Sequence, residues 1–471
     1  MTGALVWFRR DLRLADNPAI SAAGPGWQGV FILDDALLAQ GAASTWRLAQ
    51  GLAALDKDLR VRGGALWIGR GDPAVVLADL AARTGARAVH ANAWPAPAQR
   101  PIDRAVGEAL AQRDIRLTLH SGAFLVSPGR VLTGDGRMYQ VYSAFARALW
   151  ALDPPDASGD PVPAPAASHP QPEALAALIA DLSAPMNRGA AVLADHALPA
   201  GADAARDRLA AFLDGPLPDY AAGRDRADRT ATSELAEALA VGEISPRRIL
   251  ADTRAAIAAR PALAKAGQTF LSELVWREFA WHLLYDRPDM ETAEWRPEWQ
   301  GFPWQGASEA LTAWQRGRTG QALVDAGMRE LFATGRMHNR IRMVVASYLT
   351  KHLLTDWRLG MAWFADTLTD WDPASNAMNW QWVAGCGPDA APYFRIFNPL
   401  LQADKADPSG AYTRRWLTHP DVERAAPRSW HLPDPRRRPP PLIDLAQGRA
   451  RALAVFQDWK ARQVAPPRHP A

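Results

Sequence analysis

The segment WRLAQGLAALDKDLRVRGGALWIGRGDPAVVLADLAART (residues 46–84) alternates helical and extended patterns. Apolar residues recur at helical spacing in 46–60 and 73–84, and the apolar run ALWIG (65–69) between them is typical of a strand. Similar short runs lie at 4–8, 29–33, 88–92 and 115–120. Strands that alternate with helices predict a parallel sheet covered by helices, and therefore an α/β, Rossmann-like domain at residues 1–128.

Proline marks the end of this region. DPPDASGDPVPAPAASHPQP (153–172) is too rich in proline for a regular helix or a central strand, and we place a Pro/Ala-rich interdomain linker at residues 129–204. Beyond about residue 175 strand patterns nearly vanish and long helical patterns follow. The sequence therefore predicts a mainly α-helical domain at residues 205–471.

Composition narrows the class of protein. The single cysteine, Cys386, excludes an intrachain disulfide and a cysteine-built metal site, and it favours a reducing, cytoplasmic compartment. No apolar stretch approaches the roughly 20 residues of a membrane helix. The net charge of +3 means that any nucleic-acid surface must be local. We expect a cytoplasmic monomer without a metal and without a membrane contact.

Two apolar helical patterns carry charged residues. In LSELVWREFAWHLL (271–284), Glu273, Trp276 and Arg277 share one face, and such charges are paired or functional when buried. An internal ion pair between Glu273 and Arg277 is the simpler interpretation. RMHNRIRMVVASYLTKHLL (336–354) also groups polar residues on one face, for which a capped helix start with solvated arginines is the simpler interpretation.

Tryptophan is concentrated late in the chain. Five of the 20 tryptophans lie between Trp357 and Trp382, interleaved with short polar residues in TDWDPASNAMNWQW (369–382). This composition is more typical of a wall for a flat, polar-edged ligand than of a simple core.

These segments together resemble a known family. VWFRRDLRLADNPAI (6–20), GEISPRR (242–248), ELVWREF (273–279), GRTGQALVDAGMREL (317–331), MHNRIRM (337–343), DWDPASN (370–376), NWQW (379–382) and APYFRIFNP (391–399) are similar, in order and spacing, to motifs of the photolyase/cryptochrome flavoproteins. The resemblance covers nearly the full length. It implies an N-terminal antenna domain, a linker and a helical domain that holds FAD, in a bacterial photolyase of the branch near plant cryptochromes.

The resemblance implies a set of cofactor contacts. Arg342 and Asp370 match a buried ion pair against the flavin ring, and Asn376 matches the residue beside flavin N5. Photolyases usually have asparagine there and plant cryptochromes aspartate; an amide can hydrogen-bond reduced flavin without adding charge. The full set is Tyr220, Thr232, Ser233, Leu235, Phe270, Arg277, Asn339, Arg342, Asp370, Asp372 and Asn376.

Three tryptophans match the family's electron-transfer chain, namely Trp380, Trp357 and Trp304. Core packing is the simpler interpretation of each one alone. Together with Glu273 and Asn376 they form the implied catalytic set.

The resemblance also implies a pocket for a flipped-out pyrimidine dimer. Aromatic walls can sandwich flat bases, a carboxyl can donate to a carbonyl that gains charge, and arginine anchors phosphates. The implied DNA-binding residues are Arg224, Glu273, Trp276, Asn339, Arg340, Met343, Trp382 and Gln402.

The implied function is light-driven splitting of cyclobutane pyrimidine dimers in UV-damaged DNA. Two alternatives stay open: a cryptochrome-type receptor without repair activity, and a (6-4) photolyase that uses His338 or His282 as acid and base. For an antenna chromophore the resemblance favours methenyltetrahydrofolate over deazaflavin.

The phosphate motif departs from the family pattern. TSELA (232–236) ends on Ala236 where the family commonly has serine, and Glu234 adds negative charge. Arg336 replaces a usual tryptophan, and Met378 and Asn379 replace small residues. A lost hydrogen bond to a charged group costs on the order of 1.5–3 kcal/mol, so we expect weaker FAD retention than usual.

Overall fold

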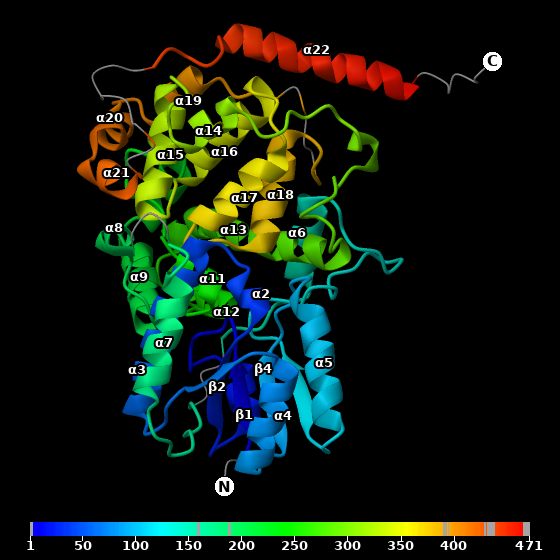
Figure 1. The fold of residues 1–471 in the computed structure, drawn as a ribbon, viewed down its shortest axis with the longest axis vertical. Helices are drawn as coiled ribbons and strands as arrows, with labels where there is room; N and C mark the ends of the chain where they lie inside the picture. The colour runs from blue at the N-terminus through cyan, green and yellow to red at the C-terminus, as the bar shows by residue number, and fades with distance from the viewer. Residues whose placement is uncertain are drawn as a thin grey trace, which may run out of the picture.

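The first part of the molecule is built on a parallel sheet (Figure 1). The computed structural model describes residues 3–157, 161–186, 190–389, 393, 395–427, 430 and 439–464. The strands are β1 (Leu5–Phe8), β2 (Gln28–Leu33), β3 (Trp67–Arg70), β4 (Ala88–Asn92) and β5 (Arg116–His120). They lie in the order β3-β2-β1-β4-β5, and every pair is parallel. The α/β prediction is confirmed, with strand bounds within two residues of those expected.

Helices cover both faces of this sheet. They are α1 (Pro18–Ala23), α2 (Asp35–Leu38), α3 (Ala42–Val61), α4 (Pro73–Thr84) and α5 (Gln99–Ala111). Alternate residues of β1 point to opposite faces, as in any strand. Val6 and Phe8 pack in the core beneath α3, whereas Leu5 and Trp7 pack in the core beneath α4 and α5.

The region predicted as a linker contains helices, and in this respect the prediction was incomplete. Three of them lie within residues 129–204: α6 (Tyr142–Ala151), α7 (Pro172–Ser183) and α8 (Ala190–Asp195). Leucines of α7, Leu178 and Leu182, share a core with α3, and Phe145 of α6 belongs to the core of the helical part. Their alanine- and leucine-rich sequences bury apolar faces, so this region joins both parts. The described residues between Asp153 and Gln171 form no helix, as their proline content predicts.

The remainder is helical, and its described residues contain no strand. The α-helices are α9 (Ala202–Asp214), α10 (Tyr220–Gly223), α11 (Ala236–Val241), α12 (Pro246–Ala259), α13 (Ala264–Asp286), α14 (Glu309–Gln315), α15 (Ala322–Thr334), α16 (Asn339–Ser347), α17 (Trp357–Thr367), α18 (Pro373–Ala384), α19 (Pro399–Ala406), α20 (Ala411–Thr418), α21 (Pro420–Ala425) and α22 (Leu445–Val464). In Figure 1, α22 lies at the end of the molecule farthest from the sheet.

Buried ion pairs link the helical part to the first domain. Arg47 of α3 donates from Nε to Glu237 at 3.1 Å and from Nη2 to Glu243 at 2.6 Å. All three side chains are at most 5% exposed, so each charge depends on its partner. Beside them, Gly242 has φ of 74°, and a Cβ there would lie 2.3 Å from the Arg10 carbonyl oxygen. The segment after β1 is therefore packed directly on the turn after α11.

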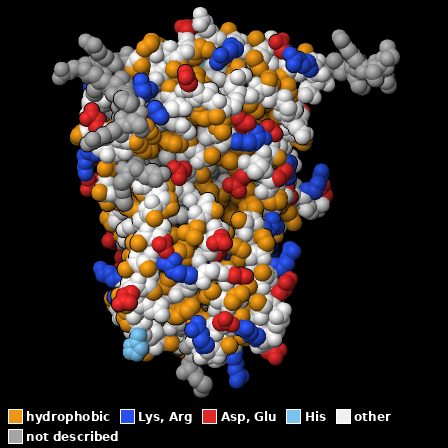
Figure 2. Space-filling model, in the orientation of Figure 1, with side chains coloured by type: hydrophobic (Ala, Val, Ile, Leu, Met, Phe, Trp, Pro, Cys, Tyr) orange, Lys and Arg blue, Asp and Glu red, His pale blue; other side chains and the backbone are white. Residues whose placement is uncertain are grey.

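The surface carries mixed charge. On the face drawn in Figure 2, basic and acidic side chains are interspersed rather than gathered into one patch. Within the described part of the chain, no helix has the length and apolar character needed to span a bilayer.

Candidate active site

The ring of Trp276 stacks on a tyrosine ring. Its indole ring on α13 stacks on the ring of Tyr142, the first residue of α6, with centroids 3.6 Å apart and an interplanar angle of 3°. The Tyr142 hydroxyl donates to the Ser272 carbonyl at 2.9 Å. Burial, assisted by Glu273, raises the pKa of Tyr142 to about 12, so the hydroxyl keeps its proton. Because Tyr142 covers one face of the half-buried indole, a flat ligand would have to stack on the opposite face.

Two adjacent residues after α10 link the predicted DNA-side residues. Arg224 Nη1 donates to Glu273 Oε1 at 2.5 Å, and Asp225 Oδ2 accepts from Arg340 Nη2 at 2.5 Å. The simpler interpretation, an internal ion pair, is confirmed, but the expected partner is wrong, because Glu273 pairs with Arg224 and not with Arg277. Glu273 acts here as an acceptor, so donation to a ligand would require it to gain a proton and turn from Arg224.

Arg277 contacts the first domain. It donates from Nη1 to the Ala123 carbonyl at 3.1 Å and to Glu278 at 3.3 Å, and its guanidinium lies over the Phe124 ring. Its predicted role at the cofactor stays a prediction.

The predicted Arg342–Asp370 ion pair is present. Arg342 Nη2 donates to Asp370 Oδ2 at 2.7 Å, and Arg342 Nε donates to the Met337 carbonyl at 2.8 Å. Asp370 Oδ1 is buried and has no hydrogen-bond partner among the described residues. A buried carboxylate oxygen in that state fits a ligand that brings an N–H donor. The ring system of FAD carries such a group.

Helix α18 begins at this point. Asp372 is its N-cap: Oδ1 accepts from Ser375 N at 2.8 Å, and Oδ2 accepts from Trp281 Nε1 at 2.7 Å. One turn later, Asn376 donates from Nδ2 to the Met361 carbonyl at 3.1 Å. That bond fixes the amide orientation and leaves the Asn376 carbonyl oxygen on the other side. Both carboxylate oxygens of Asp372 therefore have protein partners, while Asn376 keeps an acceptor for a ligand.

The phosphate motif ends on Ala236, the first residue of α11, and its Glu234 pairs with Arg336, a second departure from the family pattern that lies elsewhere in the chain. Arg336 Nη1 donates to Glu234 Oε1 at 3.2 Å, and Arg336 Nη2 donates to the His196 carbonyl at 3.1 Å. Glu234 is exposed and has φ of 51°, whereas Thr232 and Ser233 are half-buried and Leu235 is buried. The negative charge that predicted weak phosphate binding is thus balanced by the arginine that replaced a tryptophan.

An aromatic corner lies on the neighbouring elements. The rings of Tyr220 and Phe270 are 5.6 Å apart at 85°, and Phe212 lies 4.7 Å from Phe270. Both predicted cofactor residues are buried, at 7% exposure, in a T-shaped cluster.

The three predicted relay tryptophans lie on contacting elements. Trp380 of α18 is 2% exposed and lies against Gly360, where a Cβ would be 2.2 Å from its ring; Gly360 is one turn after Trp357 on α17. Backbone hydrogen bonds hold Gln305, the neighbour of Trp304, beside the residues that precede Trp357. Gln305 N donates to the Leu354 carbonyl at 2.8 Å, and Asp356 N donates to the Gln305 carbonyl at 2.9 Å. Trp380 and Trp357 are buried and Trp304 is half-buried, so Trp304 is the one of the three that reaches solvent.

The other predicted DNA-side residues lie on nearby helices. Asn339 is exposed at the start of α16, Met343 is one turn further, and Gln402 is half-buried on α19. The backbone bond from Ala227 N to the Ala406 carbonyl, at 2.8 Å, holds the Arg224 segment beside α19. Trp382 is half-buried near the end of α18, with the Arg395 guanidinium 5.9 Å from its ring.

Sequence reasoning missed Tyr142 and Asp225. Tyr142 lies 134 positions before Trp276 by their numbers, 276 − 142, and its segment YSAFARALW has an ordinary helical pattern. Asp225 lies in a mixed run of charges, AGRDRADR (222–229), that gives no sign of its partner. Only the folded arrangement identifies these contacts.

Known proteins agree with this architecture. Residues 4–166 match the DNA photolyase family model, and residues 270–458 match the FAD binding domain of DNA photolyase. The chain is 40% identical over 469 residues to the deoxyribodipyrimidine photo-lyase of Agrobacterium fabrum, covering 96% of this chain and 97% of that one. It is 37% identical to the enzyme of that name from Thermus thermophilus, covering 96% and 98%.

Solved structures give the same result. A class III photolyase from Agrobacterium tumefaciens superposes with a TM-score of 0.88 at 38% identity, covering 98% of both chains. A Synechocystis cryptochrome superposes with a TM-score of 0.81 at 26% identity, covering 97% of this chain and 99% of that one.

A parallel-sheet domain joined to a helical FAD-binding domain defines the class, and the chain belongs to the photolyase/cryptochrome family. Within the family it stands near class III photolyases and cryptochromes, as the sequence motifs predicted.

Proposed function

We propose that this protein is a deoxyribodipyrimidine photolyase that splits cyclobutane pyrimidine dimers in DNA by light. The observation that carries the proposal is the Trp276 ring, held by Tyr142 and flanked by the Glu273–Arg224 pair on one surface. A stacking face beside a cation and a carboxyl suits two fused bases and their phosphates. The relatives named deoxyribodipyrimidine photo-lyase support the same activity.

FAD is the cofactor that the helical domain fits. When bound and reduced, FAD would supply, on absorbing blue light, the electron that opens the dimer ring, and it would regain that electron once the ring is split. We propose that the Arg342–Asp370 pair and Asn376 hold the ring system, through the Asp370 Oδ1 acceptor and the Asn376 amide. Thr232, Ser233 and Leu235 hold the phosphates, with Tyr220 and Phe270 behind them. The Arg336–Glu234 pair keeps that segment free of net repulsion.

The chain's own residues position the DNA. Arg224 has five N–H groups, and its pair with Glu273 engages Nη1, so the guanidinium can hold a phosphate as well. Arg340, anchored by Asp225, and Gln402 are placed to contact the strand on either side. Trp382 supplies the second aromatic wall of the pocket, with Asn339 and Met343 along its rim.

Trp380, Trp357 and Trp304 form the proposed path by which an oxidised flavin is photoreduced. Two buried rings and one half-buried ring on contacting segments support this role. Such a path prepares the enzyme and is not used in each repair turnover.

The histidines favour dimer repair over the (6-4) alternative. Burial lowers the pKa of His338 to about 4, and it lowers the pKa of His282 to about 4 as well. Both imidazoles are therefore neutral near pH 7 and have no extra proton to give to a lesion. Asn376 and the stacking surface around Trp276 favour repair over a receptor without activity.

The antenna chromophore we expect is methenyltetrahydrofolate rather than deazaflavin. Ligands of open α/β sheets commonly bind where strand order reverses, here between β1 and β4. That place is filled by the chain itself: Arg9 pairs with Asp103 at 2.5 Å, and Asn92 donates to Asp11 at 2.6 Å. We therefore place the chromophore elsewhere on the first domain. Energy transfer to FAD after addition of each pigment decides between them.

We also propose the domain division 1–128, 129–204 and 205–471, with a cytoplasmic monomer as the working form. The single buried cysteine supports a reducing compartment. Size-exclusion chromatography with light scattering measures the oligomeric state.

The experiment that tests the proposal combines DNA binding and repair. Base–aromatic stacking contributes about 1–3 kcal/mol, so Trp276→Ala should weaken binding to dimer-containing DNA by roughly 5- to 150-fold. Glu273→Ala should lower light-driven repair by bound enzyme. Trp67→Ala, on β3 of the first domain, is the matched control and should change neither. Unchanged affinity and repair in Trp276→Ala would overturn the assignment of the pocket.

A further inference from the structure

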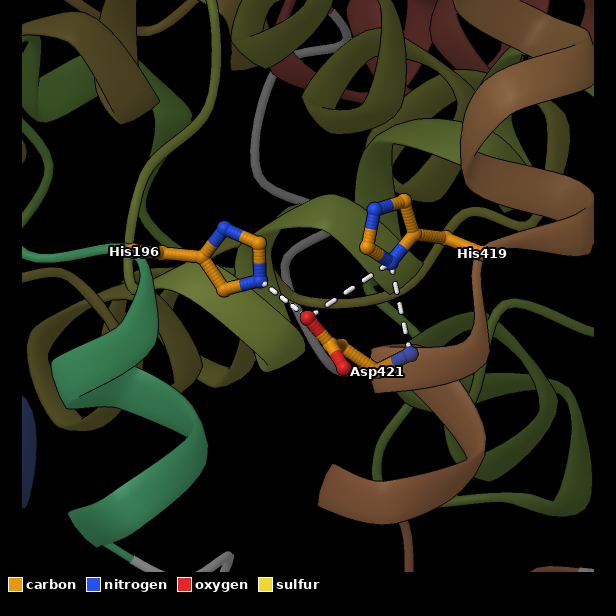
Figure 3. Close-up of side chains that lie close together, drawn as sticks. All are labelled: His196, His419 and Asp421. Atoms are coloured by element: carbon orange, nitrogen blue, oxygen red, sulfur yellow. Dashed lines mark hydrogen bonds and ion pairs between the residues drawn. The ribbon is translucent and has the colours of Figure 1, made fainter.

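We propose that His196, His419 and Asp421 form a binding site for a divalent transition-metal ion. His196 follows α8, and the other two residues begin α21 (Figure 3). His196 is far in the sequence from the neighbouring pair His419 and Asp421, which is why no spacing motif revealed the three together and the sequence predicted no metal.

The distances suit a small ion. His196 Nε2 lies 2.8 Å from Asp421 Oδ2, and His419 Nδ1 lies 3.8 Å from the same oxygen. All three ligand atoms lie within 4.8 Å of one another. Ligand atoms bound tetrahedrally to zinc at about 2.0–2.1 Å are roughly 3.3 Å apart, so the observed separations lie on both sides of that value. Small side-chain rotations therefore bring all three into the coordination sphere.

The protonation states are also suitable. His419 is the N-cap of α21, and its Nδ1 accepts from Asp421 N at 3.3 Å, so this nitrogen carries no proton; a bound ion would take its one lone pair and replace this long hydrogen bond. His196 Nε2 and Asp421 Oδ2 share a hydrogen bond that an ion can replace, with the imidazole proton moved to Nδ1. Two imidazoles and one carboxylate favour Zn²⁺, Ni²⁺ or Cu²⁺ over Mg²⁺ or Ca²⁺.

The surroundings orient the carboxylate and moderate its affinity. Arg424 donates from Nη1 to Asp421 Oδ1 at 2.7 Å, which leaves Oδ2 facing the histidines, and its Nη2 lies 3.1 Å from Asp195. Asp195 thereby balances part of the arginine charge. Arg415 faces the cluster from α20, with its guanidinium over Trp416, whose ring is 5.0 Å from His419. The histidine and aspartate side chains are 13–23% exposed, so an ion can enter from solvent.

A bound ion would join α8 to α21. The His196 carbonyl accepts from Arg336, which in turn pairs with Glu234. The ion would therefore steady the segment that we propose holds the FAD phosphates. This last link rests on the proposed function, whereas metal binding itself does not.

Zinc titration of the FAD-containing protein tests the site, by calorimetry and by metal analysis after gel filtration. We expect one ion per chain in the wild type. His419→Asn removes the imidazole but keeps a side-chain oxygen suited to the N-cap, so folding should be preserved. Its affinity for Zn²⁺ should fall at least about tenfold, since even supporting residues of metal sites contribute 10- to 100-fold.

A second histidine pair supplies the matched control. His90 Nδ1 and His120 Nε2 lie 3.0 Å apart on β4 and β5, but no third candidate ligand joins them among the described residues, so we do not expect this pair to hold the ion. His120→Asn should leave the affinity unchanged. The proposal would be overturned if His120→Asn lost zinc binding and His419→Asn kept it. It would also be overturned if the wild type bound no zinc at about 0.1 mM, which is 100 times a typical micromolar Kd. Unfolding midpoints measured without metal verify that both variants are folded. Zinc should raise the midpoint of the wild type and of His120→Asn, but not that of His419→Asn.

Discussion

Glu278→Gln tests how α13, the helix that carries Glu273 and Trp276, is held against the first domain. Glu278 is 0% exposed. Its Oε2 accepts from Leu125 N at 2.9 Å and from Val126 N at 3.3 Å. Burial raises its pKa from 4.5 to about 7, against the opposing effect of Arg277. Because the pKa is raised on folding, the stabilising contribution of this group is fully present below about pH 4.5 and is lost as the pH rises through 7.

The size of the effect follows from the shift. The difference is 7 − 4.5 = 2.5 pKa units. At about 1.36 kcal/mol for each unit this is roughly 3 kcal/mol in full, and most of it, about 2–3 kcal/mol, falls between pH 5 and pH 8. Glutamine has the same shape and can accept from the same two N–H groups, but it does not ionise. The free energy of unfolding of the variant minus that of the wild type should therefore be larger (more positive) at pH 8 than at pH 5, by about 2–3 kcal/mol.

Urea unfolding followed by tryptophan fluorescence, at pH 5 and pH 8, measures this difference. Glu298→Gln, at an exposed position, is the control and should show no pH-dependent change relative to the wild type. A difference between Glu278→Gln and the wild type that is the same at both pH values would refute the reasoning. It would mean that Arg277 and the two backbone donors hold the pKa of Glu278 near its usual value.

Three further predictions concern the cofactor and the pocket. Trp380→Phe should abolish photoreduction of oxidised FAD, followed by absorbance under blue light, while repair by chemically reduced protein persists; an unchanged rate would contradict the relay. Arg336→Gln should weaken FAD retention in dialysis by about 1.4- to 5-fold, the equivalent of an exposed ion pair of 0.2–1 kcal/mol, and Glu234→Gln added to it should restore retention; no recovery in the double variant would argue against charge balance. Tyr142→Phe keeps the stack on Trp276 and should leave affinity for dimer DNA nearly unchanged, whereas Tyr142→Ala should lower it; equal affinities would show that the stack does not position Trp276.

The fold was largely predictable because its signals are local. Each strand of the sheet is a short apolar run, and each covering helix has its own periodicity, so neighbouring residues alone define them. The helices within residues 129–204 were missed because the proline-rich stretch at 153–172 outweighed the helical patterns on either side of it. Their stability depends on packing, as Leu178 and Leu182 against α3 illustrate.

The site was predictable where motifs carry it and unpredictable where it depends on distant partners. The Arg342–Asp370 pair was expected from the family resemblance and is present at 2.7 Å. The predicted partner of Glu273 was wrong because the prediction chose Arg277, which is close in sequence on the same helix. The actual partner, Arg224, approaches from another element. Glu234 and Arg336 each looked unfavourable alone, and their pairing needed the fold to bring them within 3.2 Å.

The central claim is that the protein repairs one kind of lesion by light. Chemically reduced, FAD-containing protein is given oligonucleotides with a single cyclobutane thymine dimer or a single (6-4) photoproduct, in blue light and in darkness. We predict that intact thymines return in the dimer substrate under light, with no change in darkness and none in the (6-4) substrate. Protein that binds FAD and dimer DNA but releases no repaired strand under light would contradict the account and identify a receptor instead.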